Sequence, residues 1–127
     1  MSVKERQVAA LKAFCEQRMK NNLIGIEKYW ADDGTLTPSQ NAKKTYTGHG
    51  EIKEYYRNAP AARGSYSEPE YVHQDLYEFV LDAGMGVKYS VHVRFSEDDV
   101  YFKSFQAQSI GWVNQMYFDL TTYIGKD

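Results

Sequence analysis

The stretch from Tyr29 to Tyr56, YWADDGTLTPSQNAKKTYTGHGEIKEYY, predicts the end of a helix, a sharp turn, a short strand, a loop and the start of another helix. Residues 31–34, Ala-Asp-Asp-Gly, are typical of a turn, because aspartate hydrogen-bonds to its own backbone there. Pro38 should end the extended piece, and a new helix should begin near Gly48. This arrangement could hold an acid or a base at the mouth of a cavity.

Two further helices are predicted before and within this stretch. In residues 3–20, apolar side chains recur at the spacing of one helical face, as shown by Val8, Leu11, Cys15 and Met19. The Asn-Asn pair that follows should break this helix and cap a second one over residues 23–30. With the helix that starts near residue 48, the first half should contain three helices.

The second half changes to a period of two residues. Apolar and polar residues alternate over residues 71–81, 87–95, 100–110 and 113–124, and the breaks between these segments are rich in turn residues. Helices followed by hairpin-linked strands predict an α+β fold. We expect one domain, residues 1–127, in which a long, curved, mostly antiparallel sheet wraps around the three helices and forms a cone.

Strand parity predicts which side chains face the inside of this cone. Over residues 87–95, the face expected inside is apolar and consists of Val87, Tyr89, Val91, Val93 and Phe95. The face expected outside is polar and consists of Lys88, Ser90, His92, Arg94 and Ser96.

Composition excludes several classes of function. The net charge is −2 with both signs interspersed, so no basic stripe predicts nucleic-acid binding. The single cysteine, Cys15, excludes an intrachain disulfide, and the three histidines lack the spacing of metal ligands. No phosphate-binding or dinucleotide motif is present, so no cofactor is expected. The charged N-terminus and the lack of a long apolar run favour a cytoplasmic protein without membrane contact.

Three segments carry a resemblance to a known family. IGIEKYWADDGTL (24–36), YTGHGEIKEYYR (46–57) and SIGWVNQMYFDL (109–120) resemble the second helix, the third-helix entry and the last hairpin of the NTF2-like fold. The similarity is greatest to its ketosteroid-isomerase-like and SnoaL-like members. The resemblance implies a helix-filled cone with one open end. It implies no single activity, because this fold hosts isomerases, hydratases, epoxide hydrolases, polyketide cyclases and noncatalytic binding modules.

The catalytic groups of ketosteroid isomerases are missing at the matching positions. The family's helix-one tyrosine falls on Phe14, which has no hydroxyl group. Its catalytic base would lie beside Pro38, but no carboxylate lies between Asp33 and that proline. Its oxyanion-hole acid falls near Lys103. Ketosteroid isomerase chemistry is therefore not expected.

His73 and Asp75 are the first candidates for other acid–base chemistry. They lie two positions apart on the aromatic face of the 71–81 strand, so Asp75 could orient the imidazole and raise its pKa. In a cavity, such a pair would be a general base. The alternative is a polar pair at a sheet edge or at a dimer face.

Tyr117 and Asp119 are the second pair of candidates. The YFD motif of residues 117–119 resembles SnoaL-like cyclases and epoxide hydrolases, in which an aspartate on the last strand is the acid or base. Parity makes Met116, Phe118 and Leu120 the core face, which would point Asp119 outward unless a β-bulge reverses it. Both orientations remain open at this stage.

The aromatic content, 15% with 11 tyrosines, favours a cavity for a partly apolar ligand, although tyrosine is also common on strands in general. The residues expected to line the cavity are Phe14, Trp30, Tyr55, Tyr56, Tyr89 and Met116. One hypothesis is a pocket that performs acid–base chemistry (isomerisation, dehydration, cyclisation or epoxide opening) on an apolar, ring-bearing substrate. The other is a noncatalytic ligand carrier or a protein-interaction module. A homodimer is expected in either case, through apolar residues on the convex face of the sheet.

Overall fold

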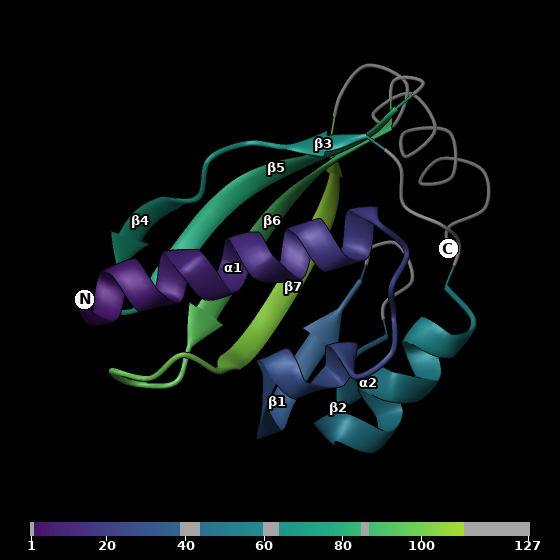
Figure 1. The fold of residues 1–127 in the computed structure, drawn as a ribbon, viewed down its shortest axis with the longest axis horizontal. Helices are drawn as coiled ribbons and strands as arrows, with labels where there is room; N and C mark the ends of the chain where they lie inside the picture. The colour runs from purple at the N-terminus through teal and green to yellow at the C-terminus, as the bar shows by residue number, and fades with distance from the viewer. Residues whose placement is uncertain (1, 39–43, 60–63, 85–86, 111–127) are drawn as a thin grey trace, which may run out of the picture.

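The computed structural model describes residues 2–38, 44–59, 64–84 and 87–110, and it shows an α+β fold (Figure 1). Helix α1 crosses one face of a curved sheet, and α2 lies beside β1 and β2. The helical elements are α1 (Val3–Met19), the 3₁₀ helix η1 (Ile26–Tyr29) and α2 (Gly48–Arg57). The strands are β1 (Trp30–Thr37), β2 (Tyr46–Thr47), β3 (Ser65–Tyr66), β4 (Glu70–His73), β5 (Leu76–Gly84), β6 (Val87–Phe95) and β7 (Phe102–Ile110).

Helix α1 confirms the helix predicted over residues 3–20. It begins with a capping box, in which the Ser2 hydroxyl accepts from the Glu5 backbone N–H at 3.1 Å and the Glu5 carboxylate accepts from the Ser2 backbone N–H at 2.9 Å. Its buried face carries Leu11, Phe14 and Cys15. No helix within the described residues is long and apolar enough to cross a membrane.

The second predicted helix, over residues 23–30, is wrong. Only η1 forms there, after Gly25 in a left-handed conformation with a φ of 75°. Trp30 leaves the helical path and pairs with Phe102 as the first residue of β1. Strand pairing and full burial of the Trp30 side chain stabilise this extended path. The described part of the chain therefore has two α-helices.

The turn predicted at residues 31–34 is also wrong, because these residues belong to β1. The register of β1 against β7 shifts between Trp30 and Thr35, which marks a bulge. Asp32 and Asp33 are exposed on this bulge. Gly34 is buried there against the backbone of Phe102.

The sheet has the strand order β2-β1-β7-β6-β5-β3, and β4 pairs separately with β5. The β1–β7 pair is parallel and the other pairs are antiparallel, so the predicted mostly antiparallel sheet is confirmed. Strand β7 lies between β1 and β6 and confirms most of the strand predicted over residues 100–110. The strand predicted over residues 113–124 lies outside the described residues.

The single strand predicted over residues 71–81 is wrong. Strands β4 and β5 form a hairpin there, with Gln74 and Asp75 in the turn at φ values of 48° and 63°. This reverses the chain and places Tyr71 opposite Tyr77, with ring centroids 5.4 Å apart. Two-residue turns of this kind usually contain glycine, which is why the sequence pattern did not reveal this one.

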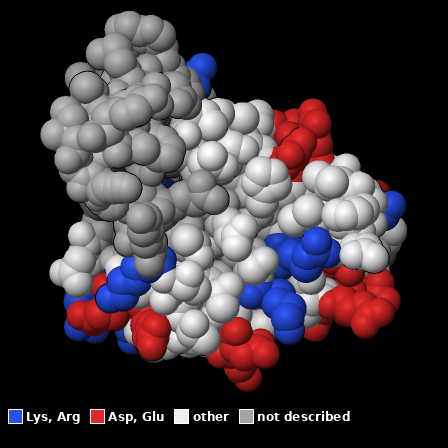
Figure 2. Space-filling model, turned by 180° about the vertical axis from the view of Figure 1, so that it is seen from behind, with Lys and Arg blue, Asp and Glu red and all other residues white. Residues whose placement is uncertain are grey.

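The two faces predicted for residues 87–95 are confirmed on β6. Val91, Val93 and Phe95 are buried under α1. On the opposite face, His92 lies across from Glu78, with its Nε2 atom 3.2 Å from the carboxylate. Figure 2, seen from the side opposite that of Figure 1, shows both positive and negative side chains around a broad uncharged area. Because the outer face of β6 carries Lys88, Ser90, His92 and Arg94, the apolar surplus expected on the convex face is not found on this strand.

Gln7 ties the N-terminal half of α1 to the sheet. Its side chain is fully buried, and its Nε2 atom donates to a carboxylate oxygen of Asp75 at 2.9 Å and to the Asp99 carbonyl at 2.8 Å. The Tyr77 hydroxyl donates to Gln7 Oε1 at 2.9 Å. All hydrogen-bonding atoms of this buried amide thus have partners, as a stable buried polar group requires.

Candidate ligand-binding site

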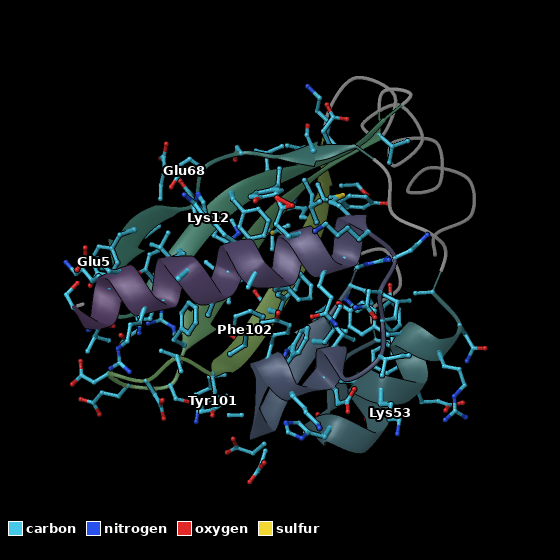
Figure 3. All side chains as sticks on the ribbon, viewed as in Figure 1. Glu5, Lys12, Lys53, Glu68, Tyr101 and Phe102 are labelled. Atoms are coloured by element: carbon cyan, nitrogen blue, oxygen red, sulfur yellow. The ribbon has the colours of Figure 1, made fainter. Side chains whose placement is uncertain are left out.

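The centre of the interior is filled by aromatic rings. Phe14 on α1 makes edge contacts, with centroids 5.3 to 6.4 Å apart, to Tyr29, Trp30, Tyr56, Phe102 and Phe105. Figure 3 shows Phe102 beneath α1. The Trp30 indole N–H donates to the Thr35 carbonyl at 2.9 Å, which satisfies its polar atom. Phe14, Trp30 and Tyr56 were predicted as cavity wall, and here they pack on one another as core.

Towards the C-terminal end of α1, several tyrosines pack against this core. We call Tyr46, Tyr55, Tyr56, Tyr66 and Tyr89 the tyrosine cluster. The Tyr55 ring lies 5.0 Å from both the Tyr46 and the Tyr56 rings, and Tyr89 packs against the same core. The Tyr66 hydroxyl donates to the Glu16 carboxylate at 2.8 Å. Apart from Tyr56, the cluster residues are only partly buried, whereas the rings around Phe14 are buried except for that of Tyr29.

Arg18, in the last turn of α1, brings a positive charge to this cluster. Its guanidinium lies 5.4 Å from the centroid of the Tyr56 ring. Burial raises the pKa of both Tyr55 and Tyr56, and the Arg18 charge opposes this rise. The two phenols are therefore neutral hydrogen-bond donors at physiological pH. The sequence analysis missed Arg18, although its position four residues after Phe14 places both on one helical face.

Cys15 is buried on the same face of α1, and burial together with the nearby Glu16 charge raises the pKa of its thiol to about 12. We expect iodoacetamide to modify the folded protein at pH 8 at least about 1,000-fold more slowly than a free thiol, because the thiolate is the reactive form. Mass spectrometry of timed samples measures this rate.

The urea-unfolded chain is the control and should react at the rate of a free thiol. Because the folded state holds the proton more tightly than the unfolded state, the stability that this thiol contributes is complete below its ordinary pKa and is lost as the pH rises towards 12. Equal alkylation rates in the folded and unfolded chains would contradict the burial of Cys15.

Comparison with solved structures identifies the fold. No protein-family model and no curated protein matches the sequence. A solved structure from Bacillus subtilis, described as a "Putative Isomerase", is similar at a TM-score of 0.70 and 16% identity, over 94% of this chain and 96% of that chain. An NTF-2-like protein of unknown function from Burkholderia xenovorans gives a TM-score of 0.69 at 9% identity, over 86% of each chain. The fold is NTF2-like.

A third solved structure is similar in fold. A "putative ketosteroid isomerase" from Kribbella flavida is similar at a TM-score of 0.61 and 10% identity, over 85% of this chain and 80% of that chain. At such low identities the comparison defines the NTF2-like architecture and transfers no activity. The site must therefore be judged from the residues of this chain.

His73 and Asp75 lie away from the tyrosine cluster of this NTF2-like interior. His73 is exposed at the end of β4, and the turn separates it from β5. The Asp75 carboxylate accepts from Gln7, two helical turns before Cys15, or roughly 12 Å along the axis of α1. Within the described residues, His73 and Asp75 form neither a hydrogen bond nor an ion pair with each other. Their catalytic role stays a prediction.

The remaining predicted site residues divide into two groups. Tyr55 and Tyr89 lie in the tyrosine cluster, as a cavity wall would require. Met116, Tyr117 and Asp119 lie outside the described residues, so their roles stay predictions. Among the residues that the structure describes, no group of three or more histidine, cysteine, aspartate or glutamate side chains could hold a metal ion.

Proposed function

We propose that this NTF2-like protein binds a small, apolar, ring-bearing molecule at the tyrosine cluster. The observation that carries this proposal is that the burial of the aromatic rings decreases towards the C-terminal end of α1. Apart from Tyr29, the rings around Phe14 are buried, whereas Tyr46, Tyr55 and Tyr89 are only partly covered. Such rings offer flat apolar contact to a ring-bearing ligand, and their hydroxyls offer hydrogen bonds that orient it.

Binding without catalysis is the form of this proposal that the described residues favour. Their buried polar or charged side chains are Gln7 and Glu27, and neither is hydrogen-bonded to a residue of the tyrosine cluster. An acid–base enzyme needs a carboxylate or an imidazole at its reacting atoms. The described carboxylate that does contact the cluster, that of Glu16, is exposed and already accepts from the Tyr66 hydroxyl. An isomerase, dehydratase, cyclase or epoxide hydrolase activity would therefore depend on Asp119, with Tyr117 as the second candidate.

Thermal unfolding against a panel of steroids, polyketide-like phenols and terpenoid epoxides tests this proposal. A ligand that binds only the folded state adds about 2.7 kcal/mol at a hundredfold excess over its Kd, which raises the Tm by several degrees. Arg18→Met and Tyr55→Ala should reduce the shift, while Tyr101→Ala, an exposed aromatic in the 96–101 loop, should leave it unchanged. A panel without any shift would overturn the proposal.

A ligand found in this way also separates binding from catalysis. If turnover accompanies binding, Asp119→Asn should abolish turnover and keep the Tm shift. If the protein is a carrier, the unchanged chain shows no turnover, and Asp119→Asn should keep the Tm shift. Substrate consumption measured by chromatography distinguishes the two forms.

We also propose that the protein forms a homodimer, as NTF2-like proteins commonly do. The described convex face offers cross-strand polar pairs such as His92 with Glu78, so a dimer through it would rely on polar contacts. Light scattering at micromolar concentration should give twice the chain mass of 14.7 kDa. A single-chain mass would contradict this proposal.

A further inference from the structure

An open surface pocket lies between the 21–25 loop, η1 and α2, and no residue of the tyrosine cluster lines it. Its volume is about 560 Å³. Figure 3 labels Lys53, which reaches it from α2. We call it the η1 cavity; the lining residues that matter here are Leu23, Ile24, Glu27, Lys28, Lys53 and Arg57.

Glu27 is the unusual member of this lining. Its side chain is only 7% exposed, and its Oε1 atom has no hydrogen-bond partner. Within the described residues, Glu27 also forms no ion pair with the three cations that share the cavity. A buried oxygen without a donor destabilises the folded state, and a charged one does so more strongly. The Oε1 atom itself has less than 1 Å² of accessible surface, so a ligand would act through the rest of the carboxylate: a positive group placed beside it would offset the cost of burying its charge.

The cations of the η1 cavity are exposed to solvent, in contrast to the buried Glu27. Lys28 and Lys53 are exposed, and neither forms an ion pair with any other described residue. Arg57 is also exposed and is engaged by Glu54 at 3.1 Å. The cavity thus has one buried negative group and exposed positive groups, two of which are available to an anion.

An aliphatic surface completes the lining. Ile24 is 90% exposed, the largest value among the exposed large hydrophobic residues of the described chain, and Leu23 beside it is partly buried. An exposed isoleucine gains free energy when an apolar group covers it. The cavity therefore offers contact to a small hydrocarbon side chain next to its charged groups.

We infer that the η1 cavity binds a small aliphatic zwitterion of the α-amino-acid class. Its ammonium group donates to Glu27, its carboxylate faces Lys28 and Lys53, and its side chain covers Ile24. An inorganic anion fits less well, because the buried Glu27 carboxylate repels it. A divalent cation such as Ca²⁺ or Mg²⁺ fits less well, because it needs about six oxygen ligands and would face three positive side chains.

An NMR titration of the full chain with L-leucine tests this inference. We expect saturable shifts of the backbone amides of residues 23–28 and 53–57, with a Kd of about 1 mM. Two analogues separate the charged groups: 4-methylpentanoate lacks the ammonium group, and 3-methylbutylamine lacks the carboxylate. Each should bind at least about tenfold more weakly than leucine, because each loses one of the two charge contacts.

Matched variants locate the site. Glu27→Gln should weaken leucine binding at least about 30-fold, since it removes one partner of a buried charge pair, and Lys53→Gln should weaken it several-fold. Lys103→Gln, the same charge change on β7, should have no effect. Should Glu27→Gln fail to fold, Lys53→Gln and the two analogues still decide the question.

Three outcomes would overturn the inference. The first is an absence of saturable shifts up to about 50 mM leucine, a concentration far above the expected Kd. The second is equal binding of leucine and 4-methylpentanoate, or of inorganic phosphate at the same amides, which would indicate a simple anion site. The third is unchanged leucine binding by a folded Glu27→Gln variant. None of these outcomes bears on the tyrosine cluster, because the two sites share no residue.

Discussion

Phe14→Ala is expected to lower the free energy of unfolding by about 4 kcal/mol, the largest effect of any single substitution considered for this chain. Phe14 is 1% exposed, and its ring contacts five other aromatic rings from η1, β1, α2 and β7. Alanine would leave a cavity at the point where both helices meet the sheet, and the surrounding rings are too rigid to close it. Urea unfolding followed by circular dichroism measures the loss.

Two control variants make this prediction specific. Phe14→Leu keeps most of the apolar volume and should lose clearly less stability than the alanine variant. Tyr101→Ala removes an aromatic side chain that is 47% exposed and should change the free energy of unfolding by less than about 1 kcal/mol. A loss below about 2 kcal/mol for Phe14→Ala would show that the aromatic core is not packed as described.

Gly34→Ala is expected to destabilise the protein by about 3 kcal/mol. A Cβ atom at this position would lie 2.5 Å from the Phe102 carbonyl oxygen and 2.9 Å from Cδ1 of Trp30. The carbonyl belongs to the backbone of β7, so the methyl group can fit only if β1 and β7 move apart. That movement would break the parallel pairing through which β1 joins the sheet. Thermal and urea unfolding both measure the loss.

Gly50→Ala is the matched control for this substitution. Gly50 lies in α2, and a Cβ atom there would meet nothing within 4 Å. Alanine should therefore stabilise the protein by about 0.5–1 kcal/mol through its better helix propensity. If both alanine variants were equally stable, the close approach of Gly34 to β7 would be disproved.

Helices and strands whose apolar residues recur at a regular short spacing were predictable from the sequence. The apolar spacing of α1 gave its length and its buried face, and the alternation along β6 gave both of its faces. In each case one stripe or one face is buried against a single partner, so the period of the sequence and the period of burial coincide. The start of α2 near Gly48 was predicted for the same reason, since Ile52 and Tyr56 lie one turn apart on its buried face.

Features that depend on a distant partner were not predictable. Residues 23–30 have a helical pattern, yet Trp30 is extended because Phe102, far along the chain, offers it a strand to pair with. The 74–75 turn contains no glycine, and Asp75 is held by Gln7 from α1. The interpretation of His73 and Asp75 as neighbours on one strand failed for this reason.

The candidate sites divide in the same way. The number of tyrosines and the position of Tyr55 and Tyr56 on one helix predicted an aromatic interior from the sequence alone. Only the tertiary structure brought Tyr46 and Tyr89 to Tyr55, set Arg18 over the Tyr56 ring, and buried Glu27 beside three cations. The physical reason is that periodicity records which face of an element is apolar, whereas the burial of a charge and the packing of rings depend on segments that meet only after the chain has folded.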